Sequence, residues 1–265
     1  MLDYFGFTRQ PFSRDLPPSS LFRSSGFKEA LARLEYVASS RLIGVLTGEV
    51  GSGKSTVARA FSSRLDPTKN PVVYISDSFL DPRGFYREAL WQLGVAPAFL
   101  RADARRQFSA VLMDLWESQG KSPVIIIDEA HGLSQEMLNE IRYLTNFRLD
   151  SVSPFSLILI GQTELRAHLR LKSLEAVKQR ISVRYHLPPL SEQETKDYIA
   201  HSMKASGASS NMFTDGAVRL IHAHSRGIPR VINNICISCL IDLKARGGQM
   251  VEEDNVKRAV AELED

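Results

Sequence analysis

An eight-residue segment, Gly48–Ser55, constrains the fold of this chain more than any other part of its sequence. It reads GEVGSGKS and matches the phosphate-loop pattern G-x-x-x-x-G-K-S at every specified position. An apolar run at 42–46 comes before it, and a segment of helical composition at 56–61 follows it. A strand, a glycine-rich loop and a helix in this order are typical of a site that binds nucleotide phosphates.

Each residue type in this loop has a physical role. Glycines let the backbone approach a polyphosphate closely, so that successive N–H groups point toward it. We expect Lys54 to reach the β- and γ-phosphates of ATP and the Ser55 hydroxyl to bind Mg²⁺. The residues predicted to hold the nucleotide are Gly48, Glu49, Val50, Gly51, Ser52, Gly53, Lys54, Ser55 and Thr56. The alternative, a glycine-rich turn with a chance Lys-Ser pair, does not account for the flanking strand and helix.

A second motif follows another apolar run. Residues 124–127 are Val-Ile-Ile-Ile, and Asp128 and Glu129 come directly after them. The run indicates a strand buried on both faces of a parallel sheet, and α/β proteins place ligands at the carboxyl ends of such strands. We expect Asp128 to hold Mg²⁺, directly or through water, and Glu129 to orient and deprotonate an attacking water. The pair predicts an ATPase rather than a kinase with a bound acceptor, although an acidic pair closing a strand can also be a simple surface feature.

The rest of the chain has two parts. Apolar runs at 42–47, 72–76, 124–128, 155–161 and 182–187 predict strands, and the helical patterns between them predict a parallel sheet with helices on both faces. After the break at Pro188-Pro189 only helical patterns remain, at 192–206, 215–224, 229–245 and 252–263. We therefore predict an α/β nucleotide-binding domain over residues 1–190 and a helical domain over residues 191–265.

Composition and charge exclude few partners or cellular locations for this protein. The net charge of +3 over 265 residues neither requires nor excludes a nucleic-acid partner. No apolar stretch approaches the ~20 residues of a membrane span, and residues 1–5 lack the features of a signal peptide. We therefore expect a cytoplasmic protein with no membrane contact. Cys236 and Cys239 lie in an apolar helical run, which favours a helix core over a metal or redox site.

Further polar residues follow the fourth and precede the fifth predicted strand. Gln162 is our first choice for a side chain that contacts the γ-phosphate or the attacking water, and Thr163 is the second, although Thr163 also fits a plain helix cap. Arg180 is a candidate arginine finger, offered to the nucleotide of a neighbouring subunit. Arg184 and Arg170 compete with it for this role, and each of the three is also compatible with a solvated surface charge.

A third signal lies in the helical part of the chain. Gly227, Ile228 and Pro229 precede Arg230, and proline is favoured in the first turn of a helix. Arg230 should therefore sit at a helix start, from which its guanidinium can fold over the phosphates when the helical domain closes.

These motifs together carry a family resemblance. In order they read GEVGSGKS, VIIIDEAH, GQTEL, LEAVKQRI and GIPR, after the opening YFGF-x4-PF. The set, which extends over nearly the whole chain, resembles the AAA+ ATPases of the ExeA/GspA and TnsC/TniB/IstB type. The resemblance implies a five-stranded ASCE sheet of order 5-1-4-3-2, a helical lid, and an ATP-dependent ring or filament with sites between subunits. It also implies that Gln162 is the first sensor, Arg180 the finger and Arg230 the second sensor.

Two functions are compatible with this resemblance. ExeA-type proteins of secretion systems continue into a membrane segment and a peptidoglycan-binding region, whereas the ATPases of transposition are compact. The absence of a membrane segment here favours an ATPase that oligomerises on duplex DNA and presents a target to a DDE transposase. The alternative is an ATPase that assists secretion or envelope assembly without DNA. The candidate contacts to DNA phosphates are Arg83, Arg101, Arg105, Arg106 and Lys121, although a solvated helix face explains each of them equally well.

Overall fold

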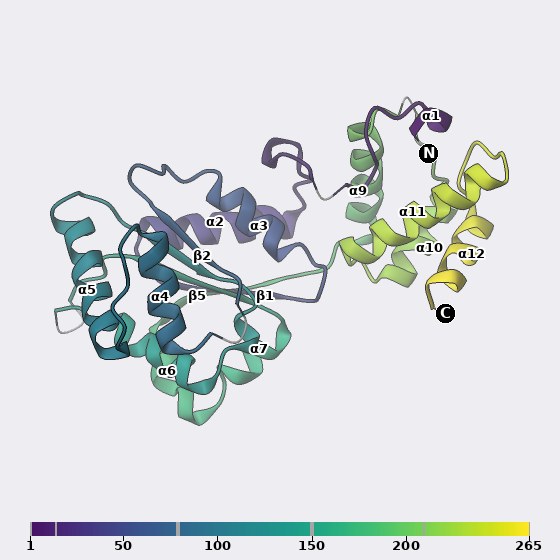
Figure 1. The fold of residues 1–265 in the computed structure, drawn as a ribbon. Helices are drawn as coiled ribbons and strands as arrows, with labels where there is room; N and C mark the ends of the chain where they lie inside the picture. The colour runs from purple at the N-terminus through teal and green to yellow at the C-terminus, as the bar shows by residue number, and fades with distance from the viewer. Residues whose placement is uncertain (1, 14, 78–79, 149–150, 209, 265) are drawn as a thin grey trace. The chain divides into compact units, whose positions relative to one another are not determined.

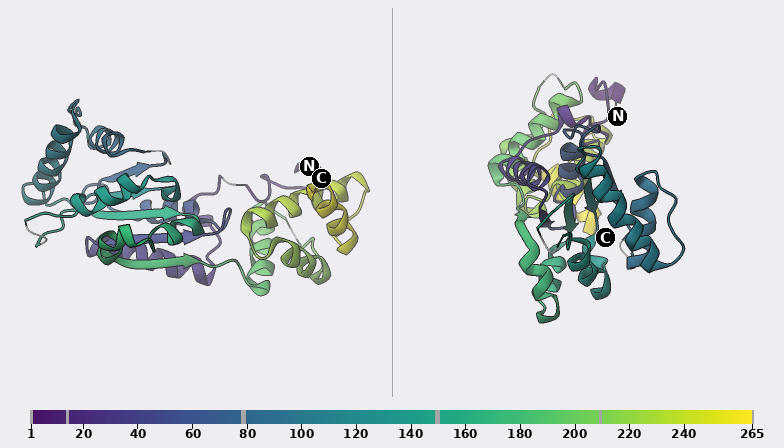
Figure 2. Two further views of the ribbon diagram at one scale, coloured as in Figure 1. Left: turned by 90° about the horizontal axis from the view of Figure 1, so that it is seen from below. Right: turned by 90° about the vertical axis from the view of Figure 1, so that its left-hand side faces the viewer.

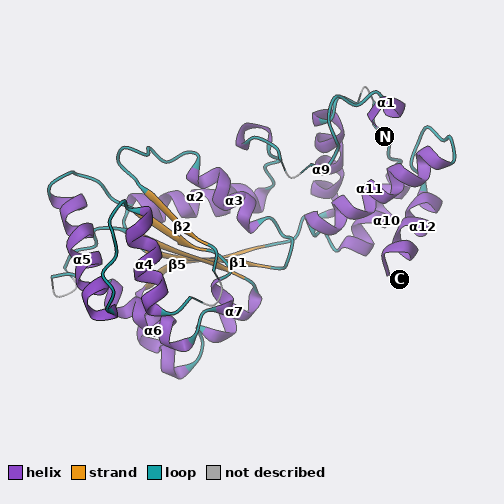
Figure 3. Cartoon of the chain, in the orientation of Figure 1, coloured by secondary structure: helices purple, strands orange, loops and turns teal. Residues whose placement is uncertain are grey.

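The chain folds into two compact units. The computed structural model describes residues 2–13, 15–77, 80–148, 151–208 and 210–264. The sheet unit contains residues 29–48 and 54–187, and the helical unit contains residues 1–28, 49–53 and 188–265. Figures 1 and 3 show the helices and strands of both units.

A five-stranded parallel sheet forms the centre of the sheet unit. Its strands are β1 (Ile43–Gly48), β2 (Val72–Ile75), β3 (Val124–Ile127), β4 (Ser156–Gly161) and β5 (Ile181–Leu187). They lie in the order β2-β3-β4-β1-β5, and every neighbouring pair is parallel. The order is the one that the family resemblance implies, and each strand begins and ends within one residue of its predicted position. The predicted α/β fold is therefore confirmed.

Helices cover both faces of this sheet. Figure 1 shows α2 (Ser25–Ser39) and α3 (Lys54–Ser62) on one side of the strands and α6 (Gln135–Leu144) and α7 (Thr163–His168) on the other. The left view of Figure 2 shows the strands between the helix layers. The other helical elements of this unit are α4 (Pro82–Gln92), η2 (Ala130–Gly132), α5 (Arg101–Glu117), η3 (Lys172–Leu174) and α8 (Glu175–Arg180). Because both faces are covered, every residue of β1, β3 and β4 is buried.

The helical unit forms its own core from four helices and the N-terminal segment. The helices are α9 (Glu192–Ala205), α10 (Asp215–Ser225), α11 (Pro229–Ala245) and α12 (Glu253–Glu264), with α1 (Leu2–Phe5) and η1 (Pro18–Ser20) before them. Ser191 and Glu194 form a capping box at the start of α9. The Thr8 N–H donates to the Ser206 carbonyl at 2.9 Å, and the buried side chains of Phe7 and Phe12 complete the apolar cluster. The predicted all-helical C-terminal part is thus present.

The two cysteines lie in this core. Both side chains are fully buried on α11, and burial raises the pKa of both thiols, that of Cys239 to about 12. Within the described ranges, no group of three or more His, Cys, Asp or Glu side chains could hold a metal ion. The expected role of Cys236 and Cys239 in a helix core is confirmed.

In the part of the chain that the structure describes, none of the helices has both the length and the apolar character needed to cross a bilayer.

Candidate nucleotide-binding site

The strand order brings three predicted motifs to one edge of the sheet. β4 lies between β1 and β3, and all three strands are parallel. Their carboxyl ends therefore lie side by side, with Gly48 at the end of β1, Asp128 after β3 and Gln162 after β4. This is the arrangement that the sequence requires if Gln162 is to reach the same ligand as the loop and the acidic pair.

The loop between β1 and α3 has the backbone of a phosphate-binding turn. Gly51 and Gly53 have φ values of 80° and 100°, in the left-handed region that favours glycine. The Ser52 hydroxyl is buried and has no hydrogen-bond partner among the described residues. A phosphate oxygen bound in the loop would give this hydroxyl a partner, so the loop fits the phosphates of a nucleotide.

Lys54 is the first residue of α3, and its ammonium group points back along the loop. The side chain is buried, and Nζ donates a hydrogen bond to the Gly48 carbonyl oxygen at 2.9 Å. This hydrogen bond places the positive charge of Lys54 next to Gly48, the first residue of the phosphate-loop motif. The role of Lys54 as a phosphate-binding cation stays a prediction.

Ser55 and Asp128, the two predicted metal ligands, are in contact. The Ser55 hydroxyl donates to Asp128 Oδ2 at 3.2 Å, and Asp128 is only 4% exposed. Asp128 Oδ1 accepts the Glu129 N–H at 2.8 Å. Oxygen ligands from one hydroxyl and one carboxylate suit Mg²⁺, which takes few protein ligands and keeps several waters. These two residues fit the predicted metal site.

A third donor to Asp128 was not predicted. The Tyr74 hydroxyl donates to Asp128 Oδ2 at 2.7 Å. The pKa of Tyr74 is raised far above its usual value, mainly by burial and secondly by this hydrogen bond. The phenol therefore stays protonated and remains a donor. The apolar run at 72–76 predicts that Tyr74 lies on a strand. The sequence gives no sign, however, that the Tyr74 hydroxyl reaches the end of β3.

Glu129 has a strained backbone and two polar neighbours. Its φ of 53° is left-handed, a conformation that costs a non-glycine residue free energy. Gln162 Nε2 lies 3.5 Å from Glu129 Oε2, and His131 Nδ1 lies 3.3 Å from the same oxygen. The carboxylate is 46% exposed and so remains accessible to water. The structure thus brings together Glu129 and Gln162, while Thr163 starts α7 next to them.

Arg230 lies at the start of α11, as its sequence context predicts. Within the helical unit its backbone N–H donates to the Gly51 carbonyl at 3.3 Å. A Cβ on Gly51 would lie 2.6 Å from the Cβ of Arg230, so only glycine fits at this loop position. Loop residues 49–53 and the GIPR segment are therefore direct neighbours.

The three arginines considered for the finger role all belong to the sheet unit. Arg180 ends α8 and is half-buried. Arg170 and Arg184 line one cavity of about 320 Å³, together with Arg166 and Lys178. The Arg184 guanidinium donates to the Lys178 carbonyl.

The five residues considered for DNA contact lie on α4, on α5 and after α5. The Arg83 guanidinium stacks on Phe99 at 4.5 Å, Arg106 pairs with Asp103 at 2.5 Å, and Lys121 donates to Gln119 at 2.9 Å. Arg101 and Arg105 instead face α6, where they contact a carboxylate that is only 3% exposed.

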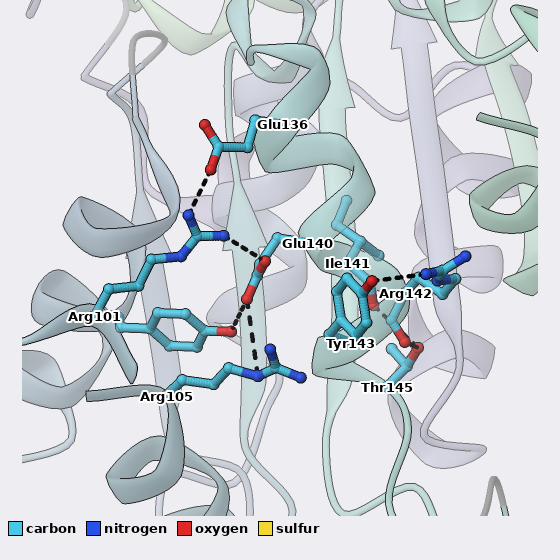
Figure 4. Close-up of polar contacts among 9 residues, drawn as sticks. Arg101, Arg105, Glu136, Glu140, Ile141, Arg142, Tyr143 and Thr145 are labelled. Atoms are coloured by element: carbon cyan, nitrogen blue, oxygen red, sulfur yellow. Dashed lines mark hydrogen bonds and ion pairs between the residues drawn. The ribbon is translucent and has the colours of Figure 1, made fainter. Parts of the chain in front are cut away.

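That buried carboxylate belongs to Glu140. Figure 4 shows Arg101 and Arg105 directed toward it, with Arg101 Nη2 at 2.8 Å and Arg105 Nε at 3.9 Å. The Tyr86 hydroxyl donates to Glu140 at 2.6 Å, and burial, followed by this hydrogen bond, raises the pKa of Tyr86. Arg101 also pairs with Glu136 at 2.5 Å. This cluster holds α4, α5 and α6 together, a role that our sequence reasoning missed, although Glu140 is the one acidic residue on the apolar face of α6.

Comparisons with known proteins agree with this geometry. The model of the AAA domain family matches residues 37–169, which is half of the chain. General secretion pathway protein A of Aeromonas hydrophila is 35% identical over 263 residues. The match covers 98% of this chain and 48% of that protein, so the chain spans about half the length of this curated relative.

Solved structures show the same fold at low sequence identity. Cdc6p of Pyrobaculum aerophilum superposes with a TM-score of 0.70 at 16% identity, covering 95% of this chain and 70% of that one. The Aeropyrum pernix ORC2 protein, in ADPNP–ADP complexes, superposes with a TM-score of 0.69 at 18% identity. This match covers 97% of this chain and 72% of that one. Together with the matched sequence model and the phosphate loop at the end of β1, this likeness shows that the chain belongs to the AAA domain family and has the family's nucleotide-binding fold.

Proposed function

We propose that this protein hydrolyses ATP in a Mg²⁺-dependent reaction and uses the hydrolysis to drive a step of general secretion or envelope assembly. The observation that carries the ATPase part is the meeting of Lys54, Ser55, Asp128 and Glu129 at one edge of the sheet. The secretion part is supported by the 35% identity to general secretion pathway protein A over nearly the whole chain.

Each residue of the site has a task in this reaction. Bound Mg²⁺ supplies positive charge that neutralises the phosphate oxygens. Lys54 binds the phosphates as a point charge, while Ser55 and Asp128 supply oxygen ligands to the metal. Glu129 accepts the proton of the attacking water, and Gln162, 3.5 Å from it, orients that water.

Two arginines complete the proposed machinery. Arg230 would act as the second sensor, because its neighbour Gly51 belongs to the phosphate loop. Arg180 would be the finger that a neighbouring subunit offers to the γ-phosphate, so hydrolysis would need an ATP-dependent oligomer. Loss of the γ-phosphate would then weaken the contacts between subunits. Replacing Arg180 by alanine should abolish turnover while ATP still binds, and normal turnover would assign the finger elsewhere.

A role in transposition has less support. Of the five candidate DNA contacts, Arg101 and Arg105 neutralise the buried Glu140, and Arg106 pairs with Asp103. These guanidiniums are already engaged by carboxylates, which reduces the free positive charge that a phosphate backbone would need. The comparison with general secretion pathway protein A also favours the secretion alternative over the transposition regulator. DNA binding and a DDE transposase partner stay predictions.

Three measurements test the proposal. Purified protein should release phosphate from ATP with Mg²⁺ and without any added acceptor, and Lys54→Ala should abolish this. Duplex DNA should bind weakly or not at all at low salt with ATP present; tight binding that falls steeply as salt rises would favour the transposition alternative. Removal of the gene from its host should reduce the amount of exported protein, and the wild-type gene, but not the Lys54→Ala form, should restore export.

A further inference from the structure

We propose that Tyr74 is a positioning residue for the metal site, whose hydroxyl holds the Asp128 carboxylate in the orientation that a divalent cation requires. The inference rests on the proposed Mg²⁺-dependent ATPase. It adds a residue that belongs neither to the phosphate loop nor to the Asp128-Glu129 pair. Its basis is the set of contacts around Asp128 and the way in which the backbone of Tyr74 is fixed.

Both oxygens of Asp128 are held by hydrogen-bond donors. Oδ1 accepts the Glu129 N–H at 2.8 Å, and Oδ2 accepts the Tyr74 hydroxyl at 2.7 Å and the Ser55 hydroxyl at 3.2 Å. Rotation of the carboxylate about its Cβ–Cγ bond would break contacts at both oxygens. The shortest of these contacts comes from Tyr74, which makes it the strongest side-chain restraint on Asp128. Partners of this kind orient metal ligands and raise metal affinity.

The backbone of Tyr74 is itself held by hydrogen bonds to the side chain of Gln92. The Gln92 side-chain amide accepts the Tyr74 N–H at 2.9 Å and donates to the Tyr74 carbonyl at 2.8 Å. Gln92 also donates to Glu88 at 2.6 Å, one turn earlier on α4. On the other side β2 pairs with β3, where Tyr74 lies opposite Ile126. The hydroxyl of Tyr74 therefore approaches Asp128 from a backbone position that is held on both sides.

Packing alone does not account for this tyrosine. Its side chain is on an edge strand, and the residue is 42% exposed. The Tyr74→Phe substitution keeps the ring and removes only the hydroxyl, so the fold should stay intact. The Tyr74→Phe substitution therefore tests the hydrogen bond to Asp128 rather than folding.

The experiment compares metal-dependent with metal-free nucleotide binding. A fluorescent non-hydrolysable ATP analogue is titrated into wild type and Tyr74→Phe, once with Mg²⁺ and once with a chelator. We expect the gain in affinity from Mg²⁺ to fall by about 10-fold in Tyr74→Phe, with unchanged affinity in the chelator. Gln92→Met should change the same quantity in the same direction but by less. Tyr36→Phe is the matched control, since Tyr36 is an exposed tyrosine of the same unit and lies on α2.

Each remaining outcome decides against the inference. An equal gain from Mg²⁺ in wild type and Tyr74→Phe removes the positioning role but leaves the proposed ATPase intact. Loss of affinity to the same degree with and without Mg²⁺, or a lowered melting temperature, assigns a structural role to Tyr74. A wild-type protein that binds no nucleotide overturns both the proposed function and this inference.

Discussion

Arg101 Nη2 lies 2.8 Å from Glu140 Oε2 and joins α5 to a carboxylate that is only 3% exposed on α6. A buried carboxylate is costly unless it is paired and hydrogen-bonded. Glu140 meets this requirement with Arg101, Arg105 and the Tyr86 hydroxyl. The cluster thereby fixes the packing of three helices beside the sheet.

Arg101→Met should destabilise the protein because it leaves Glu140 with too little positive charge. We expect a loss of about 1–3 kcal/mol in the free energy of unfolding, measured by urea denaturation. Arg106→Met is the control, because Arg106 is 79% exposed and pairs with the exposed Asp103; its effect should stay within about 0.5 kcal/mol. Adding Glu140→Gln to Arg101→Met should recover part of the loss. Equal stability of Arg101→Met and wild type would contradict this account.

Glu129→Gln should separate binding from turnover. The amide keeps the size of the side chain but cannot accept a proton from water, so hydrolysis should fall by about 10²–10⁴-fold. ATP affinity, measured with the same fluorescent analogue, should stay within about twofold of wild type, because Lys54 and the loop are unchanged. Turnover at the wild-type rate would exclude Glu129 as the base and direct attention to His131, 3.3 Å from its carboxylate.

Gly227→Ala should destabilise the helical unit through a steric clash. Gly227 has a φ of 74°, and a Cβ there would lie 2.0 Å from the Leu190 carbonyl oxygen. That approach is enforced by the hydrogen bond from the Leu190 N–H to the Gly227 carbonyl, at 2.8 Å. Gly247→Ala is the matched control, since Gly247 has a φ of 69° with open space around it.

Both alanine variants share the cost of a left-handed alanine, about 1 kcal/mol. Gly227→Ala should lose at least about 2 kcal/mol more than Gly247→Ala in urea denaturation, because the backbone at Leu190 must move. Similar losses in the two variants would show that the segment around Leu190 gives way easily.

The stability of the helical unit should depend on pH through Asp242. The hydrogen bond from Arg258, at 2.8 Å, lowers the pKa of Asp242 well below its usual value, and Arg246 and Asn255 add to this effect. A carboxyl with a lowered folded-state pKa stabilises the fold fully above the unfolded pKa of about 4. That contribution is lost as the pH falls below about 4 toward the folded-state pKa.

The corresponding variant is Asp242→Asn. It should be less stable than wild type at pH 7, and the difference in free energy of unfolding should shrink as the pH falls below 4. Glu262→Gln is the control, because Glu262 is an exposed carboxylate on α12 of the same unit. A constant difference between Asp242→Asn and wild type from pH 7 to pH 2.5 would rule out this source of pH dependence.

The sequence predicted most of the fold because its signals were local. The apolar runs that became β1, β3 and β4 are continuous, as burial on both faces requires, and Pro229 marked the start of α11 at the observed residue. The order of the strands, however, came from the family resemblance. Periodicity along a chain identifies strands but does not order them in a sheet.

The candidate site was predictable only where a motif is contiguous. Lys54, Ser55 and Asp128 follow from two short patterns, but the hydroxyl of Tyr74 reaches Asp128 across 54 residues of chain. Glu140 shows the opposite difficulty, because Arg101 and Arg105 read as a basic surface cluster until their buried partner is known. Such pairings depend on helix packing, which a single sequence does not reveal.

The Gln92 side chain has one further consequence. Its amide forms hydrogen bonds with the Tyr74 N–H and carbonyl, as the peptide group of an additional strand would. At the opposite edge of the sheet, the Arg33 guanidinium donates to the carbonyl oxygen of Arg184 on β5. An incoming polypeptide therefore finds these main-chain positions already taken, which guards the sheet against edge-to-edge aggregation. To pair with these main-chain groups, another chain would first have to displace the Gln92 and Arg33 side chains.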